Sequence, residues 1–488
     1  MNIQYKWLLI LFVFGFVACE SDDDSPVVEE VVITSGTADF STYVALGNSL
    51  TAGFTDGALF IAAQENSMPN ILAQQFALAG GGTFTQPLMS DNVGGALLGG
   101  TQILSPRFFF NGAGPAVLPA TPTTEISAGL SGTFNNMGIP GAKSFHLLAN
   151  GYGNIAGLPS LANPYFVRMA SSPNASVLED AMAQNPTFFS LWIGNNDVLG
   201  YALSGGDGSD PITDTATFDQ AYGALVATLT SGGAKGVIAN IPDVTSIANF
   251  TTVSHNPVPL DAATAGAVNA AYALYNGGIV QAFAGLVMAG AISQEDADAE
   301  IARRTISFTA GEGNAVVILD EDLTDLTGLN PNLTNMRQAT ADDLLVLASA
   351  SFIGTLADPG NPLSVNGVAI PLADRWVLTP EEQAEIATAT TAFNATISAA
   401  AQQAGLAFVD ANALLVEVAS TGIAFDEFLL QGDLVFGGAF SLDGVHPTAR
   451  GYAFIANKTM EAINATYGSN LPMVKAEDYP TFYSPMLP

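Results

Sequence analysis

Four short apolar runs along the chain predict buried strands, because each is rich in β-branched or aromatic residues and each is followed by small or polar residues. The runs cover residues 42–46, 187–193, 236–241 and 406–410. The stretches between them are long enough for helices. Strands that alternate with helices predict an α/β fold with a parallel sheet covered on both faces. Ligands of such sheets bind beyond the carboxyl ends of the strands.

The clearest helix signal begins at Thr379, which is suited to cap a helix N-terminus. Pro380 takes the first helical position, and Glu381 and Glu382 follow in the first turn, where carboxylates suit the helix dipole. The pattern predicts a helix that runs toward Gln403.

Two long segments do not fit a minimal alternation of strands and helices, namely residues 80–132, which are rich in Gly and Pro, and residues 249–375. Loops of this length are usually functional or form a subdomain of their own. Within the second segment, the alanine-rich stretch Ala262 to Ile292 has two interpretations. It forms an apolar wall or lid over a site, or it is a helix packed for stability.

The N-terminus has the layout of a secretory signal. Lys6 precedes an apolar run from Trp7 to Ala18, which is short for a membrane span, and Cys19 follows. The ending resembles a bacterial lipobox, which implies a signal peptide over residues 1–18 and lipidation of Cys19. Residues 19–39 then form an acidic tether, residues 40–470 the folded domain and residues 471–488 a C-terminal tail. The acids after Cys19 resemble those of surface-displayed lipoproteins, so we expect an anchored protein of the cell envelope, on the outer membrane.

The charge balance excludes some partners. The chain of 488 residues has 45 Asp and Glu but only 12 Lys and Arg, for a net charge of −33. Phosphate binding needs basic residues, so we expect no nucleic-acid partner. Cys19 is the single cysteine and the three histidines are dispersed, so the sequence predicts no disulfide, no metal site and no cofactor.

Candidate chemistry lies at Ser49, where the first predicted strand turns toward a helix after Gly47. A serine in such a turn can expose its hydroxyl as a nucleophile. Near the C-terminus, Asp443 stands three residues before His446, and a carboxylate at this spacing can orient an imidazole base. His146 and His255 lack such a partner in the sequence, and we expect structural or surface roles for them.

Two further polar turns could hold an oxyanion. Residues 194–197, Gly-Asn-Asn-Asp, close the second predicted strand, and an asparagine amide there can donate a hydrogen bond. Residues 135–144 form a Gly-rich turn whose backbone N–H groups could do the same. Turn formation alone also explains both segments.

The four segments in this order resemble the blocks of the SGNH hydrolases, also called GDSL esterases and lipases. The resemblance implies a three-layer αβα sandwich of the flavodoxin-like type, here with large insertions. It makes Ser49 the nucleophile, His446 the base and Asp443 its orienter. The oxyanion hole would use the N–H of Ser49, the N–H of Gly141, with Gly138 as the fallback, and the amide of Asn196.

The sequence departs from the family at Asn48, where the family has an aspartate, and in the long spacing between its blocks. The expected activity is hydrolysis of carboxylic esters of a lipid, a glycan or another small molecule through an acyl-enzyme. The alternative is a surface lipoprotein that binds glycans or lipids without catalysis. The natural ester and the oligomeric state do not follow from the sequence.

Overall fold

A five-stranded sheet forms the centre of the computed structural model, which describes residues 32–487. All neighbouring strands are parallel. The strand order is β15-β8-β7-β1-β6. The bounds are β1 (Tyr43–Gly47), β6 (Asn136–Gly138), β7 (Phe188–Trp192), β8 (Lys235–Ala239) and β15 (Ala407–Val409). The predicted α/β class with a parallel sheet is therefore confirmed, and so are the four strands expected from apolar runs.

The edge strand β6 is the exception, since the sequence indicated only a polar turn at this place. Its three residues include Asn136 and Gly138, which have low strand propensity. Tertiary contacts hold it instead: Asn136 Nδ2 donates to Thr51 O, and Ile139 N donates to Gly47 O just beyond the paired residues. An edge position tolerates so short a strand because only one side must pair.

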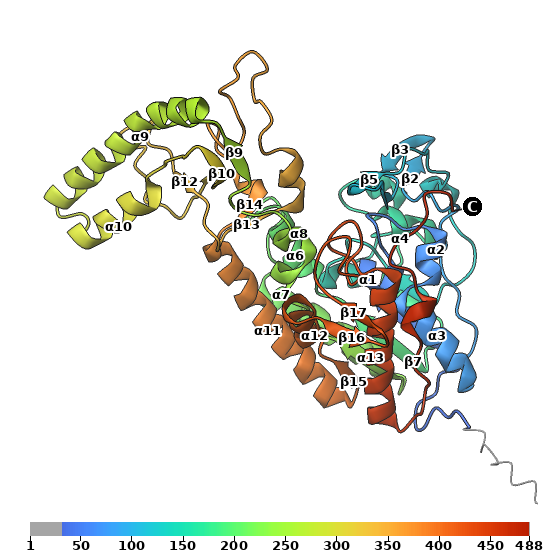
Figure 1. Ribbon diagram of the computed structural model, residues 1–488. Helices are drawn as coiled ribbons and strands as arrows, with labels where there is room; N and C mark the ends of the chain where they lie inside the picture. The colour runs from blue at the N-terminus through green and yellow to red at the C-terminus, as the bar shows by residue number, and fades with distance from the viewer. Residues whose placement is uncertain (1–31, 488) are drawn as a thin grey trace, which may run out of the picture. The chain divides into compact units, whose positions relative to one another are not determined.

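Long helices pack on the sheet and on one another (Figure 1). Helix α13 (Ala449–Tyr467) contacts β15 and α3 (Met68–Leu78), while α11 (Pro380–Ala404) contacts β8 and α7 (Thr215–Thr230). The predicted start of α11 is confirmed: Thr379 is its N-cap and forms a capping box with Glu382. Gly405 ends it in a left-handed conformation.

The remaining helices of this core are short. They are α1 (Ser49–Ala52), α2 (Ile61–Glu65), α4 (Pro164–Met169), α5 (Val177–Met182), α6 (Asn196–Leu203), α8 (Ala248–Thr251) and α12 (Ala411–Ser420), with the 3-10 turns η2 (Ser144–Leu148), η3 (Ile155–Gly157), η4 (Val244–Ser246) and η7 (Ala476–Asp478). A hairpin of β16 (Ile423–Phe425) and β17 (Phe428–Leu430) follows α12.

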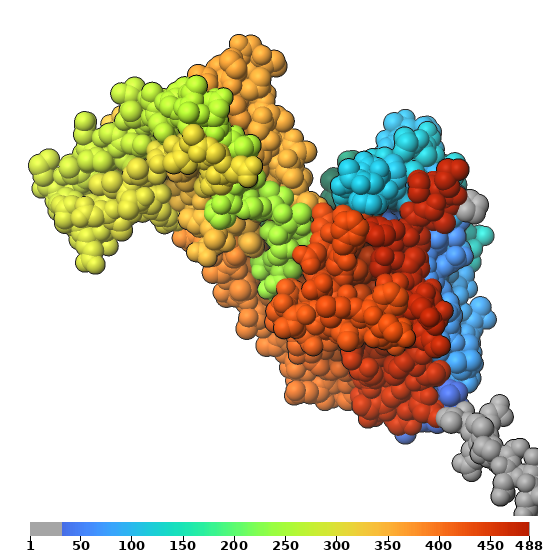
Figure 2. Space-filling model, viewed as in Figure 1, coloured from blue at the N-terminus to red at the C-terminus, as the bar shows by residue number. Residues whose placement is uncertain are grey.

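The first long segment, residues 80–132, contains two antiparallel strand pairs and the 3-10 turn η1 (Ile126–Ala128). The strands are β2 (Ala96–Leu98) with β3 (Thr101–Leu104), and β4 (Phe108–Phe110) with β5 (Pro115–Val117). The C-terminal residues lie against this segment (Figure 2). Arg107 donates to Ser484 O at 2.6 Å, and the rings of Phe110 and Phe482 stack.

The second long segment builds a hydrophobic cluster of its own, separate from the cluster around the central sheet. We call residues 249–375 the second insertion. Its elements are β9 (Val258–Leu260), α9 (Ala262–Met288), α10 (Gln294–Arg304), β10 (Gly311–Asn314), β11 (Val317–Leu319), β12 (Met336–Gln338), β13 (Leu344–Leu345) and η5 (Leu347–Ser351). It ends at η6 (Asp374–Trp376), and β14 (Val377–Leu378) follows.

Helix α9 buries one face in the cluster of the second insertion. Its buried side chains include Tyr272 and Tyr275, whose hydroxyls donate to the backbone at Val368 and Met336. This contact favours the packed interpretation of residues 262–292 over the lid. By length and composition, α9 is the one helix in the described part of the chain that could cross a membrane. Six of its side chains are buried in the cluster of the second insertion.

The folded unit reaches beyond the predicted domain boundaries at both ends. From Ile33 onward the described chain forms one compact unit. Thr37 N donates to Tyr467 O, and Ala38 is buried in the main cluster, so these residues of the predicted tether pack against the folded core. The predicted tail also packs, with Tyr483 buried in the main cluster. The predicted signal peptide and Cys19 lie outside the described residues.

Candidate active site

Ser49 begins helix α1 directly after strand β1, at the carboxyl edge of the sheet. Gly47 permits this turn, because a Cβ there would lie 2.1 Å from Thr51 Oγ1 and 2.3 Å from Trp192 O. Asn48 caps the helix by accepting a hydrogen bond from Leu50 N at 3.0 Å. These contacts fix the backbone position of Ser49 at the edge of the sheet.

His446 lies within hydrogen-bond distance of Ser49 although 397 positions separate them in the chain. The distance from His446 Nε2 to Ser49 Oγ is 2.9 Å, and that from His446 Nδ1 to Asp443 Oδ2 is 2.8 Å. The three residues predicted as a triad thus form one hydrogen-bonded chain in the order Ser–His–Asp. This is the geometry in which an imidazole can accept a proton from a serine hydroxyl.

Asp443 is surrounded by donors. Besides the His446 ring, it accepts hydrogen bonds from Gly57 N, Val445 N, His446 N and Ser441 Oγ, all at 2.9–3.0 Å. Burial alone would raise the pKa of Asp443, but the charge of His446 and these hydrogen bonds outweigh it and lower the pKa to about 2. Asp443 is therefore ionised at neutral pH and can stabilise a protonated His446.

Residues 54–57 after α1 contact the triad from the other side, and no sequence pattern predicted this contact. Phe54 lies 4.6 Å from the His446 ring, measured between ring centroids, and Thr55 Oγ1 donates to Pro447 O at 2.9 Å. Gly57 supplies its N–H to Asp443. The one local signal was the turn-forming pair Asp56–Gly57, which by itself does not identify a partner.

Asp56 itself is buried and holds Ser441 and Leu442, directly before Asp443. Its Oδ1 accepts from Leu442 N, and its own N–H donates to Ser441 Oγ, both at 3.0 Å. Burial raises its pKa to about 7, and the nearby charge of Asp443 acts in the same direction, against the Leu442 hydrogen bond and Arg107. Two carboxyl groups thus stand close together with pKa values shifted in opposite directions.

The predicted oxyanion donors come from the ends of three adjacent strands, β7, β1 and β6. Asn196 follows β7, and its Nδ2 donates to Ala142 O at 2.9 Å, which links it to the turn after β6. Gly141 lies in that turn with φ +80°. Within residues 32–487, the N–H groups of Ser49 and Gly141 have no hydrogen-bond partner, so both are free to bind an oxyanion.

Gly138, the fallback for Gly141, is less suited to this role. Gly138 lies inside β6, where a Cβ would approach Ala52 N to 2.3 Å, and its N–H already donates to Asn136 Oδ1 at 3.0 Å. The geometry therefore favours Gly141.

Asn48, which stands where the resemblance led us to expect an aspartate, pairs with the neighbouring asparagine. Its Nδ2 donates to Asn195 Oδ1 at 3.2 Å, a bond that an ionised aspartate could not donate. Asn195 is buried, and its Nδ2 has no partner in the described structure. The amide at position 48 thus joins the ends of β1 and β7 directly beside Ser49.

Asp197 is a further buried carboxylate that the sequence did not single out for a role. It accepts from Ser144 N and Ser144 Oγ, both at 2.8 Å. The bonds join the segment after β7 to η2, three residues beyond Gly141. Asp197 therefore fixes two of the candidate oxyanion donors relative to one another.

The other two histidines lie apart from this arrangement. His146 accepts from Lys143 N and stacks on Tyr152, and burial, with the charge of Lys143, lowers its pKa to about 4. The carbonyl of His255 accepts from Val316 N in the second insertion. These contacts are structural, as the sequence led us to expect.

An apolar cavity of about 120 Å³ borders Val445 and Pro447. Leu50, Val445 and Pro447, which are neighbours of Ser49 and His446 in the chain, form part of its wall, and Trp192, Val418 and Phe454 are among the others. Neither Ser49 nor His446 lines it, and no residue of α9 does.

No family model, no curated protein and no solved structure matches this chain.

Proposed function

We propose that this protein is a serine hydrolase that cleaves carboxylic esters, with a three-layer αβα sandwich of the SGNH type. The observation that carries the proposal is the hydrogen-bonded chain from Ser49 through His446 to Asp443, with links of 2.9 and 2.8 Å. Ordered polar blocks at the carboxyl ends of β1, β6 and β7 support it. Helices on the sheet and the two inserted segments are compatible with the proposed architecture.

In the acylation step, Ser49 Oγ attacks the ester carbonyl carbon while His446 Nε2 takes the hydroxyl proton. The negative charge that develops on the carbonyl oxygen is stabilised by the N–H groups of Ser49 and Gly141 and by the amide of Asn196. The bond to the alkoxy oxygen then breaks. His446 gives its proton to the departing alcohol, which leaves an acyl group on Ser49.

In the deacylation step, a water molecule attacks the acyl carbon and His446 takes its proton. The Ser49–acyl bond breaks, Ser49 regains the proton and the carboxylic acid leaves. Asp443 remains ionised throughout, since its low pKa suits it to stabilise the imidazolium form of His446 in both steps.

A second candidate function is a lipoprotein that binds glycans or lipids without catalysis. The geometry favours the enzyme, because a binding protein needs neither a serine aligned with an imidazole nor a buried carboxylate behind that imidazole. In either case the predicted lipid on Cys19 would hold the protein at the outer membrane, with an ester or glycan of the cell envelope as partner. The net charge of −33 disfavours nucleic acid.

Labelling with a fluorophosphonate probe separates the two candidates, because such probes react with activated serines. We expect a single adduct on Ser49 in the folded protein and none in Ser49→Ala. We also expect Ser49→Ala to lose essentially all hydrolysis of a short-chain aryl ester. Ser441→Ala serves as a matched serine variant that should still label. Full activity in Ser49→Ala, or an unlabelled but folded wild type, would contradict the proposal. A panel that compares acyl lengths with acetylated sugars would then define the ester.

A further inference from the structure

Three carboxylates that lie far apart in the sequence converge where the second insertion meets the core. Glu321 follows β11, Asp374 begins η6, and Glu382 lies in the first turn of α11. Each offers an oxygen atom, and the three atoms lie within 4.8 Å of one another. None of the three residues forms an ion pair within the described part of the chain, so the three carboxyl groups converge without a protein cation.

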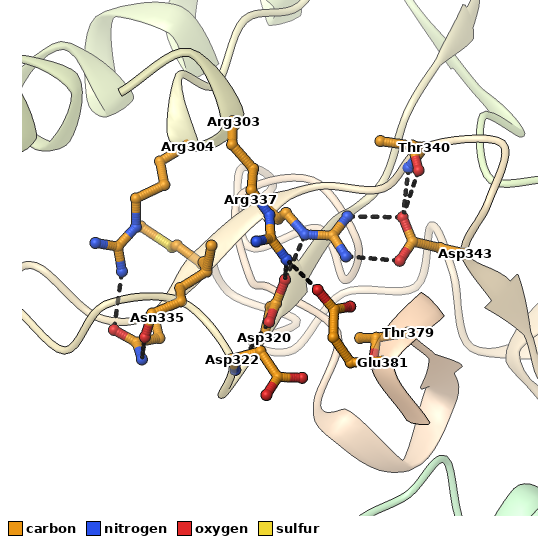
Figure 3. Close-up of polar contacts among 12 residues, drawn as sticks. Arg303, Arg304, Asp320, Asp322, Asn335, Arg337, Thr340, Asp343, Thr379 and Glu381 are labelled. Atoms are coloured by element: carbon orange, nitrogen blue, oxygen red, sulfur yellow. Dashed lines mark hydrogen bonds and ion pairs between the residues drawn. The ribbon is translucent and has the colours of Figure 1, made fainter. Parts of the chain in front are cut away.

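The neighbouring carboxylates of this region form ion pairs with arginine side chains (Figure 3). Asp320 bonds Arg303 and Arg337, Asp343 forms two bonds with Arg337, and Glu381 faces Arg303. Each of these acids thus has a guanidinium partner. Glu321 follows Asp320 in the sequence and Glu382 follows Glu381, yet neither forms such a pair within residues 32–487. We call Glu321, Asp374 and Glu382 the carboxylate cluster. Because it lacks an arginine partner, its charge is balanced by another group.

Glu382 provides an independent indication of a missing partner. Only 3% of the Glu382 surface is exposed, so the residue is more than nine-tenths buried. Hydrogen-bond donors reach only one of its two carboxylate oxygens: Thr379 N and Thr379 Oγ1 donate to Oε2 at 2.6 and 2.8 Å. The other oxygen, Oε1, is buried and has no hydrogen-bond partner, and the same holds for Asp374 Oδ1. Unpartnered buried carboxylate oxygens are costly and call for a ligand.

The backbone of the loop after α6 lies close to Asp374 and Glu382. A Cβ on Gly206 would lie 2.0 Å from Glu382 Oε1, and one on Gly205 would lie 2.3 Å from Asp374 O. Both glycines have positive φ, so the loop after α6 passes close to the carboxylates at positions that side chains would obstruct. Two ligands on opposite sides of a calcium ion are about 4.6–5.2 Å apart, which matches the spread of the three oxygens.

From these contacts we propose that Glu321, Asp374 and Glu382 form a calcium-binding site. Carboxylate oxygens are the ligands that this hard cation prefers, and the site offers neither a cysteine nor a histidine that would favour zinc or copper. A bound ion would join Glu321 and Asp374 of the second insertion to Glu382 of α11. The site thus serves to fix the inserted segment on the core, and its role does not depend on the proposed hydrolase chemistry.

Calorimetric titration and thermal unfolding of the full chain test the site, after removal of metal with a chelator. We expect one calcium ion to bind, with a Kd on the order of 10–1,000 µM. We expect 5 mM calcium to raise Tm by at least about 2 °C. Glu382→Gln and Asp374→Asn, measured separately, should each lose both responses. Glu381→Gln, a matched change in the same helical turn at a residue paired with Arg303, should keep them.

The comparison within each variant, with and without calcium, removes the effect of the substitution on stability itself. An unchanged wild-type Tm together with no heat of binding would overturn the proposal, since it would mean that the carboxylates share a proton instead. Equal responses in wild type and both cluster variants would also overturn it, as would an equal response to magnesium at the same concentration. Ester hydrolysis is not the readout, so failure of this site and failure of the proposed function are distinguishable.

Discussion

At the scale of single residues, the candidate site depends on the electrostatic state of Asp443. Five hydrogen bonds hold its two oxygens. The charge of His446 and these hydrogen bonds lower its pKa to about 2 in spite of burial. A carboxylate in this state fixes the tautomer of His446 with the proton on Nδ1, which leaves Nε2 free to accept the proton of Ser49. The reactivity of Ser49 is thus set by a residue that does not touch it.

Replacing Asp443 by Asn should therefore abolish most activity without removing the nucleophile. We expect Asp443→Asn to lower kcat roughly 10³- to 10⁴-fold, because the amide favours the wrong tautomer of His446. Ester hydrolysis and fluorophosphonate labelling rates measure the change. Ser441→Ala, which removes one donor to Asp443 but leaves the ring contact, should lose less than about tenfold. Similar losses in both variants would mean that Asp443 acts only as a structural anchor of its loop.

The sequence predicted the triad residues of the site but not the residues that support them. Ser49, Asp443 and His446 were identifiable because each lies in a short block of reactive or polar residues. The order of these blocks along the chain resembles that of the SGNH hydrolases. The supports Asp56 and Gly57 were not identifiable, since their partners lie 386 positions away. The carboxylates at 321, 374 and 382 share no local pattern either, so only their convergence in space reveals them.

At the scale of elements, the predictable parts are those in which local and tertiary preferences agree. Strands β1 and β7 are apolar and fully buried, and α11 has a cap, an N-terminal proline and a terminal glycine, so the sequence predicts all three. Strand β6 has none of these signals and exists through its contacts with β1 and α1. Strand order is likewise a property of tertiary packing that no single run of residues specifies.

The link between elements at Asp197 leads to a prediction at this scale. Asp197→Ala removes both acceptors of Ser144 and leaves the Ser144 N–H unpaired in the interior. We expect a loss of about 2–4 kcal/mol in the free energy of unfolding, from two hydrogen bonds to a charged group. Because the link also sets Asn196 relative to Gly141, kcat/KM should fall at least about tenfold.

Chemical denaturation and ester kinetics on the same preparation check both effects of Asp197→Ala. Ser144→Ala is the matched control, since it keeps the backbone N–H bond and removes the hydroxyl only. We expect it to lie between wild type and Asp197→Ala in both measurements. An Asp197→Ala variant that is destabilised but keeps its kcat/KM would show that the bonds between Asp197 and Ser144 do not position the oxyanion donors.

At the scale of the whole molecule, acidic residues far outnumber basic ones. The free energy of unfolding therefore depends on which carboxyl groups are protonated. With 45 acids and 12 Lys and Arg, most carboxylates have no cationic partner, and repulsion among them opposes the compact state at neutral pH. Exposed acids are screened by water and salt. A buried acid such as Asp56 is not, so its protonation is coupled to folding of the entire chain.

The raised pKa of Asp56 sets the sign of this coupling. Below pH about 4, the carboxyl is protonated in both the folded and the unfolded chain, given its ordinary value of 3.8. Between pH about 4 and 7 only the folded chain holds the proton, because burial raises the pKa to about 7. Asp56 therefore contributes stability at low pH that is lost as pH rises through this window, at no more than about 1.4 kcal/mol per pH unit.

Asp56→Asn should remove this loss, because an amide can still accept from Leu442 N but carries no charge next to Asp443. We expect the difference in unfolding free energy between Asp56→Asn and wild type to shift in favour of the variant from pH 5 to pH 8, as measured by denaturant titration. Asp56→Ala, which also lacks the acceptor, should be less stable than Asp56→Asn throughout but show the same shift. Parallel stability curves for wild type and Asp56→Asn would mean that the buried carboxyl is already ionised at pH 5, with Arg107 as its counter-charge.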